Sequence, residues 1–251
     1  MVMSATYQQS STPRAVTKEQ DFTNELYSRY PAHRLSAEFV RDNALASSGL
    51  LVRKIGGRSV FPYQPAGIWE ALATRNASNY VQNHGDSLYR RSLYTIWKRS
   101  SPPPSMMNFD ATDRSVCIVR RQKTASPLQA LVLMNDPQFV EAARILAEKT
   151  LVESCRLTVD RSGKQLSTVN YQLSTIFQAL IGRKPRQTEL KEIHQLFDKV
   201  LTYFKQNPEK SKQLLSVGEF PRLPDLDESE MAAYTIVAST IMNFDEFTME
   251  L

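Results

Sequence analysis

The distribution of proline divides this chain into two parts that cannot fold in the same way. Seven of the 13 prolines fall between residues 62 and 137. Each proline removes a backbone donor and restricts the residue before it. Residues 50–123 are therefore predicted to form loops and short elements. Aromatic residues and arginines recur through this segment, so we expect side-chain contacts to hold it in place.

Charge follows the same division. Residues 53–123 carry 12 Lys and Arg against four Asp and Glu, whereas the remainder carries 19 against 22 and the whole chain has a net charge of +5. One interpretation is that the arginines pair with carboxylates of the other part across an internal interface. The other is an open surface for a phosphate, a sulfate, a carboxylate or an acidic polymer.

Helical signals dominate from residue 124 onward. Ser126, Pro127 and Gln129 give a cap, a first-turn proline and a capping-box glutamine, and Asp136-Pro137 repeats the signal. The cleanest amphipathic pattern covers residues 188–206. Further helices are predicted over residues 130–135, 138–151, 169–183 and 232–247, the last apolar nearly all round and therefore central. Residues 207–226 are expected to be a polar connection.

Before residue 50 the signals are weaker. Residues 1–16 are polar and predict a flexible arm, and residues 18–30 predict a short helix ended by Pro31. Residues 37–48 predict a helix that starts at Ser36 and stops at Gly49. Its Phe39, Asn43 and Ala46 share one face, and Glu38, Arg41 and Asp42 form the polar side.

These signals together predict a mainly α-helical fold. A helical bundle over about residues 124–247 carries the loop-rich segment, about 50–123, packed on it. Residues 17–251 are expected to form a single helical domain after the arm, with a loop-rich half over 50–123 and a helical half over 124–251.

Two clusters suggest chemistry in the loop-rich segment. Tyr89, Arg90 and Arg91, with Trp97 further on, alternate aromatic and cationic groups in the way that ligand-stacking surfaces do; a solvated amphipathic segment would show the same pattern. Asp110 and Asp113 stand three residues apart, a spacing open to cation binding or acid-base catalysis, although turn capping is commoner for aspartate.

Two further clusters lie near helix ends. Arg120 and Arg121 precede the helix that starts near Ser126, where an anion would be favoured. Cys117 is nearby and is read as a small hydrophobe more readily than as a nucleophile. Asp245 and Glu246 close the central helix. Buried carboxylates need partners, and the natural ones are four arginines: Arg90, Arg91, Arg120 and Arg121.

Several kinds of site are not encoded. No C-x-x-C-H occurs, so we expect no covalent haem in this chain, and the three histidines are not at metal-ligand spacing, so we expect no metal site. No nucleic-acid-binding motif is present, and no nucleic acid is expected as a partner. The longest uncharged run, Met231–Phe244, is too short to span a membrane.

Three long stretches resemble a known bacterial family. They are SVFPYQPAGIWE, LYRRSLYTIWKRSSPPPSMMNFDATDR and CIVRRQKTASPLQALVLMNDPQFVEAAR. Together with SATYQQSS and AAYTIVASTIMNFDEF, they are similar to a domain of unknown function of the DUF1553 type. This domain is the C-terminal part of large proteins abundant in planctomycetes and related bacteria.

The resembled proteins often begin with an export signal and a cytochrome-c-like domain. The resemblance therefore implies that this chain is a C-terminal fragment, that haem belongs to an upstream domain, and that the missing N-terminal domains are partners. It also implies a periplasmic or envelope-associated location for the full-length protein, but no settled reaction. A weaker alternative that the resemblance implies is part of a cytochrome-linked redox protein whose haem domain is absent from this chain.

Three functional hypotheses follow. The first is a ligand-recognition or interaction module that binds an anionic glycan or acidic polymer through the aromatic and basic residues: Tyr89, Arg90, Arg91, Trp97, Arg120 and Arg121. The second is a hydrolase or lyase for an acidic polysaccharide, with Asp110, Asp113 or Asp245 transferring protons. The third and weakest is nucleic-acid binding. All require the arginines near positions 90 and 120 to share an open pocket.

Overall fold

The structure is a computed structural model that describes residues 3–12, 15–69, 79–157, 168–223 and 226–250. The elements in chain order are α1 (Ala15–Gln20), β1 (His33–Arg34), α2 (Ala37–Ser48), η2 (Gly85–Tyr89), η3 (Ser92–Tyr94), α3 (Pro104–Asn108), α4 (Pro127–Asn135), α5 (Pro137–Leu157), α6 (Thr168–Ile181), α7 (Gln187–Gln206), α8 (Pro208–Leu215), α9 (Glu228–Met242), α10 (Asp245–Thr248) and β2 (Met249–Glu250). The mainly helical fold predicted from the sequence is confirmed.

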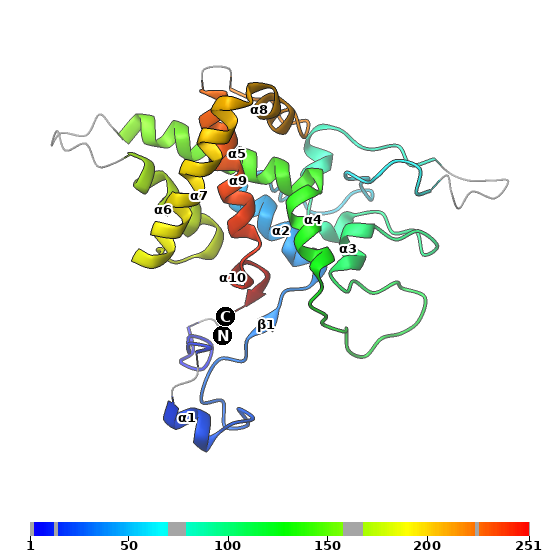
Figure 1. Ribbon diagram of the computed structural model, residues 1–251. Helices are drawn as coiled ribbons and strands as arrows, with labels where there is room; N and C mark the ends of the chain where they lie inside the picture. Colours follow the sequence, from blue (N-terminus) through cyan, green and yellow to red (C-terminus); the bar gives the residue numbers. More distant parts are fainter. Residues whose placement is uncertain (1–2, 13–14, 70–78, 158–167, 224–225, 251) are drawn as a thin grey trace.

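The bundle is organised around α9. This helix contacts α5, α7, α8, α6 and α4, and Figure 1 shows it between α6 and α7 on one side and α4 on the other. Its N-cap Asp227 accepts a hydrogen bond from the backbone N–H of Glu230 at 2.7 Å. Most of its side chains are buried. An apolar helix without a polar face requires such a central position.

The neighbouring helices bury the stripes that the sequence predicts. In α6 these are Leu173, Ile176, Phe177 and Leu180. In α5, Phe139, Ala143, Leu146 and Thr150 are likewise buried. Burying a leucine, isoleucine or phenylalanine side chain contributes about 1.5–3 kcal/mol before entropy costs. Apolar packing is therefore the main support of the helical half.

Within its described residues, 50–69 and 79–123, the loop-rich half pairs its backbone only through isolated bridges. Val52 bridges Arg90 and Val60 bridges Thr95, both in parallel. The rings of Phe61, Trp69 and Tyr80 pack edge to face with centroids 5.2–6.1 Å apart. Irregular backbone carries many polar groups outside ladders, and these must find partners elsewhere.

Helix α2 supplies some of those partners and corrects a sequence prediction. Arg41, placed on the polar side, is 3% exposed, whereas Phe39 is 55% exposed. Arg41 donates hydrogen bonds to the carbonyls of Leu88 (2.7 Å) and Arg90 (2.8 Å) and to the side chain of Gln138. Burial lowers the pKa of Arg41 to about 10. The loop-rich half covers this helix face, which a local pattern does not reveal.

Two other predictions are wrong. Residues 18–30 do not form a helix beyond Gln20, because Asn24 and Tyr27 adopt positive φ angles of 58° and 53° in turns. The expected polar connection over 207–226 contains α8, whose Ser211 and Leu215 are buried. Its start at Pro208 follows the rule that proline is favoured in the first helical turn.

Candidate functional site

The predicted aromatic and basic cluster is mostly internal. Arg90 is 6% exposed, and its guanidinium donates to the carbonyls of Lys54, Gly56 and Arg58 while it lies 3.8 Å from the ring centroid of Tyr94. Its charge therefore serves backbone carbonyls of the same chain. Arg90 is therefore internal, but its partners are carbonyls of the same loop-rich segment, whereas the internal interpretation expected carboxylates of the other part.

The residues on either side of Arg90 in the sequence contact other parts of the chain. Tyr89 is buried and donates to Glu141 Oε1 at 3.0 Å, and burial raises the pKa of Tyr89. Arg91 is exposed, with Nε 3.6 Å from Asp42 Oδ2. No hydrogen bond, ion pair or ring contact joins either side chain to that of Arg90, so adjacency in sequence does not produce one ligand pocket here.

Asp110 and Asp113 fix the two ends of a loop. Asp110, with a φ of 59°, accepts hydrogen bonds from the backbone N–H (2.7 Å) and the hydroxyl (2.9 Å) of Thr124. The Asp113 carboxylate accepts from Ser115, whereas its carbonyl accepts from Trp97 Nε1 at 3.1 Å. These contacts are typical of turn capping.

Between these anchors lies the segment we call the basic loop, residues 114–123. Figure 1 shows the connection between α3 and α4 standing out from the body of the molecule. All of its residues are exposed, among them Val116, Cys117, Ile118, Val119, Arg120 and Lys123. The loop thus presents apolar and cationic groups together to solvent.

The arginines of the basic loop differ in their engagement. Arg114 lies 4.5 Å from the ring centroid of Trp97. Arg121 donates to both carboxylate oxygens of Glu38, at 2.6 and 3.0 Å. Within the part of the chain that the structure describes, no residue hydrogen-bonds or ion-pairs with Arg120 or Lys123. These two cations are available to a ligand.

The carboxylates after α9 do not pair with the predicted arginines, and that prediction is wrong. Asp245 is exposed at the start of α10. Glu246 contacts Arg183 at 2.7 Å, and Arg183 also contacts Glu189 at 2.7 Å. The turn after α6 carries Arg183 to this place, close in space to the end of α9.

A buried charged cluster on α5 was missed by sequence reasoning. Glu141, Arg144 and Glu148 are at most 4% exposed. Arg144 lies 3.7 Å from Glu141 and 3.6 Å from Glu148. The spacing of three and four residues places all three on one helix face, and this spacing could have been read from the sequence. It was overlooked because the apolar residues of α5 dominate the pattern.

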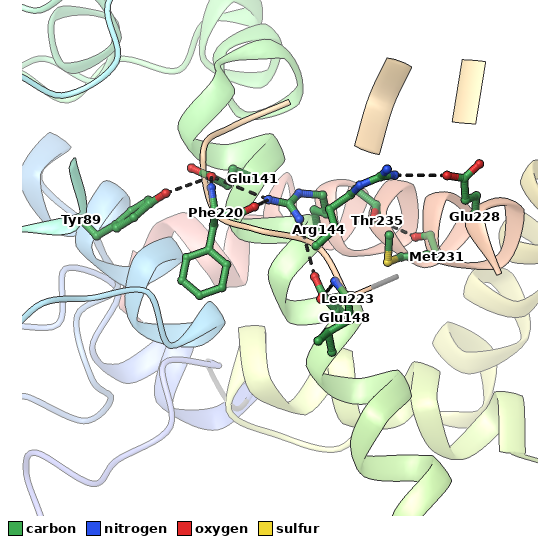
Figure 2. A network of polar contacts seen from close by, with 10 residues as sticks. Tyr89, Glu141, Arg144, Glu148, Phe220, Leu223, Glu228, Met231 and Thr235 are labelled. Atoms are coloured by element: carbon green, nitrogen blue, oxygen red, sulfur yellow. Dashed lines mark hydrogen bonds and ion pairs between the residues drawn. The ribbon is translucent and has the colours of Figure 1, made fainter. Parts of the chain in front are cut away.

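The cluster holds the segment between α8 and α9. Glu141 accepts from the backbone N–H of Phe220 and Glu148 from that of Leu223, both at 2.7 Å, and Arg144 donates to the carbonyl of Phe220 at 2.7 Å. Figure 2 shows these contacts converging from one face of α5. Buried charges are retained only with such partners, so this cluster is a structural clamp.

An open groove lies beside α4. Its volume is about 640 Å³. It is lined by Tyr63, Gln64, Pro65, Gln82, Pro104, Ser105, Asn108, Leu128, Leu131, Val132, Asn135, Asp136 and Pro137. None of the three candidate catalytic aspartates is among these residues, and burial raises the pKa of Asp136 in its wall.

Neither a metal cluster nor a spanning helix is found in the described ranges. No group of three or more His, Cys, Asp or Glu there could hold a metal ion. Among the same residues, no helix has both the length and the apolar character needed to cross a bilayer.

Fold and sites together define a helical domain with a buried charged clamp, an exposed basic loop and an apolar groove. The chain belongs to the family described as PSD1, protein of unknown function (DUF1553), whose model matches residues 1–197. The match includes the basic loop and α5 and ends within α7. No curated protein and no solved structure matches the chain.

Proposed function

We propose that this chain is a recognition module of a larger envelope-associated protein, and that it binds an anionic glycan or similar acidic polymer through the basic loop. One observation carries the proposal. The loop holds four cations and no carboxylate between residues 114 and 123, and its two ends are fixed by Asp110 and by the Trp97–Asp113 contact. A loop with anchored ends loses less conformational entropy on binding.

The cations of the loop suit an acidic polymer. Arg120 and Lys123 are exposed, so they contact an anion without first leaving an internal partner. Arg121, held by Glu38, contributes mainly to the placement of the loop. Because exposed charges are screened by salt, binding should weaken as ionic strength rises. Tyr89 and Arg90 do not belong to this contact surface, because both are buried.

The test is binding of dextran sulfate in low salt. Replacing both available cations, Arg120→Ala with Lys123→Ala, should weaken binding about tenfold, since exposed charge contacts contribute up to about 1 kcal/mol each. The matched control removes two exposed lysines of α7, Lys191→Ala with Lys199→Ala. An equal loss in both double variants would show general charge attraction and refute a site on the loop.

The envelope location and the larger parent protein belong to this proposal and are supported by the family resemblance. The hydrolase or lyase alternative gains no support from Asp110 and Asp113, because their carboxylates accept hydrogen bonds from Thr124 and Ser115. Asp245, the third candidate, is exposed at the start of α10 and does not line the groove.

A further inference from the structure

The basic loop exposes a cluster of aliphatic side chains in its middle. Val116 and Ile118 are 69% and 46% exposed, and Val119 is fully exposed. Among the residues that the structure describes, none of the three packs against the hydrophobic core. Single exposed aliphatic residues are common on protein surfaces, but three within four positions of one loop are typical of a site that contacts another molecule.

Cations lie on both sides of this cluster. Arg114 precedes it, whereas Arg120, Arg121 and Lys123 follow, and no carboxylate lies between residues 114 and 123. An acidic polymer in water neutralises such cations but leaves the aliphatic side chains hydrated. An occupant complementary to the whole loop must therefore take up apolar side chains and supply negative charge beside them.

The shape and size of the loop distinguish between occupants of this kind. Figure 1 shows the connection between α3 and α4 standing out from the body of the molecule. A stable protein interface takes about 20–30 residues from each side, whereas the basic loop spans only residues 114–123. A lipid bilayer requires neither a large contact nor a matching pocket. Its interface takes up apolar side chains, and its anionic headgroups attract cations.

We infer that residues 116–119 insert into the interface of an anionic lipid membrane, and that the cations on either side contact the lipid phosphates. Both ends of the loop are held, by the Asp110–Thr124 and Trp97–Asp113 contacts, so insertion costs less conformational entropy. The inference shares its cations with the proposed polymer site. It goes beyond that function because it requires the aliphatic side chains, and it does not depend on polymer binding.

Vesicle co-sedimentation with the whole chain tests the inference. Vesicles of equal parts phosphatidylglycerol and phosphatidylcholine should bind the protein at least about tenfold more strongly than phosphatidylcholine alone, because the cations need anionic headgroups. Ile118→Ser with Val119→Ser should weaken binding to the anionic vesicles about tenfold or more, because less apolar surface leaves water. The matched control is Val16→Ser with Leu26→Ser, which replaces two exposed aliphatic residues that lie near glutamates in the sequence.

A fluorescent reporter distinguishes insertion from charge contact. Val119→Trp places an indole at the fully exposed position of the loop. Its emission should shift to shorter wavelength when the anionic vesicles are added, because the ring leaves water, and should not shift with dextran sulfate. The shift is measured against the wild-type chain, which contains Trp69 and Trp97.

Four outcomes would overturn the inference. They are failure to bind the anionic vesicles, an equal loss of binding in the control variant, vesicle binding without a shift in emission, and self-association that Ile118→Ser with Val119→Ser abolishes. The last would identify a second copy as the occupant. Dextran sulfate binding should be unchanged in the Ile118→Ser, Val119→Ser variant, so the polymer proposal and the membrane inference can fail separately.

Discussion

The two halves of this molecule satisfy their backbone hydrogen-bonding groups in different ways. In the bundle, regular helices satisfy their own backbone, and apolar stripes such as that of α6 support the packing. In the loop-rich half, arginine guanidinium groups satisfy backbone carbonyls that no ladder pairs. The difference shows that an arginine of a basic segment, here Arg90, can serve internal hydrogen bonding and not a ligand.

The buried clamp on α5 has features of both halves. It uses charged groups, as the loop-rich half does, but it lies inside the bundle and holds the segment that leads to α9. Similarly, Arg41 of α2 holds the loop-rich half by donating a hydrogen bond to the carbonyl of Arg90. Variants at these two arginines therefore test how far each half depends on charged side chains.

The largest effect is expected at Arg144. Arg144→Met leaves Glu141 and Glu148 buried without a cation, which should lower the free energy of unfolding by about 3–5 kcal/mol. Urea unfolding followed by circular dichroism measures the change. Adding Glu141→Gln and Glu148→Gln to the same chain should restore part of the loss. A loss below about 1 kcal/mol in the single variant would contradict the clamp.

A somewhat smaller effect is expected at Arg41. Arg41→Met leaves the carbonyls of Leu88 and Arg90 without their donor, and each unsatisfied buried acceptor costs about 1–3 kcal/mol. We expect a loss of about 3 kcal/mol in urea unfolding. Arg91→Ala serves as the control and should change stability by less than about 1 kcal/mol, because the Arg91 side chain is exposed and approaches Asp42 only to 3.6 Å. Similar losses of stability in both variants would contradict the distinction between a buried, structural Arg41 and an exposed Arg91.

The smallest effect is expected at the partly exposed network of Arg183. The hydrogen bond from Arg183 lowers the pKa of Glu189 to about 2. Its unfolded pKa is near 4.3, so its stabilisation is complete above about pH 4.3 and disappears as pH falls to about 2. Glu189→Gln should cost about 1 kcal/mol or less at pH 7 and nothing near pH 2. A cost that does not change between these pH values would contradict the ion pair.

Much of the fold was predictable because helical signals are local. The cap and proline at Ser126 and Pro127 marked the start of α4, and Gly49 ends α2 with a φ of 72° as expected. The apolar stripes of α5, α6 and α7 depend on neighbours three or four residues away. Such signals predict helices wherever they occur and do not depend on the rest of the chain.

The candidate site was less predictable because its contacts are distant in sequence. Arg41 bonds to a carbonyl 47 residues away, and Tyr89 to Glu141 across 52 residues. Nothing near Arg41 distinguishes it from a solvated arginine. For the same reason Arg90 and Arg120, similar in sequence context, differ completely in exposure.

By itself, the sequence determined the helices of the bundle, the central position of α9 and the irregular backbone of residues 50–69 and 79–123, because these follow from periodicity and proline. Only the tertiary structure decided which arginines are internal and which are exposed, and that α4 presents its apolar face outward. The physical reason is that burial of a charge depends on acceptors that the folded chain brings together, and no local pattern encodes their positions.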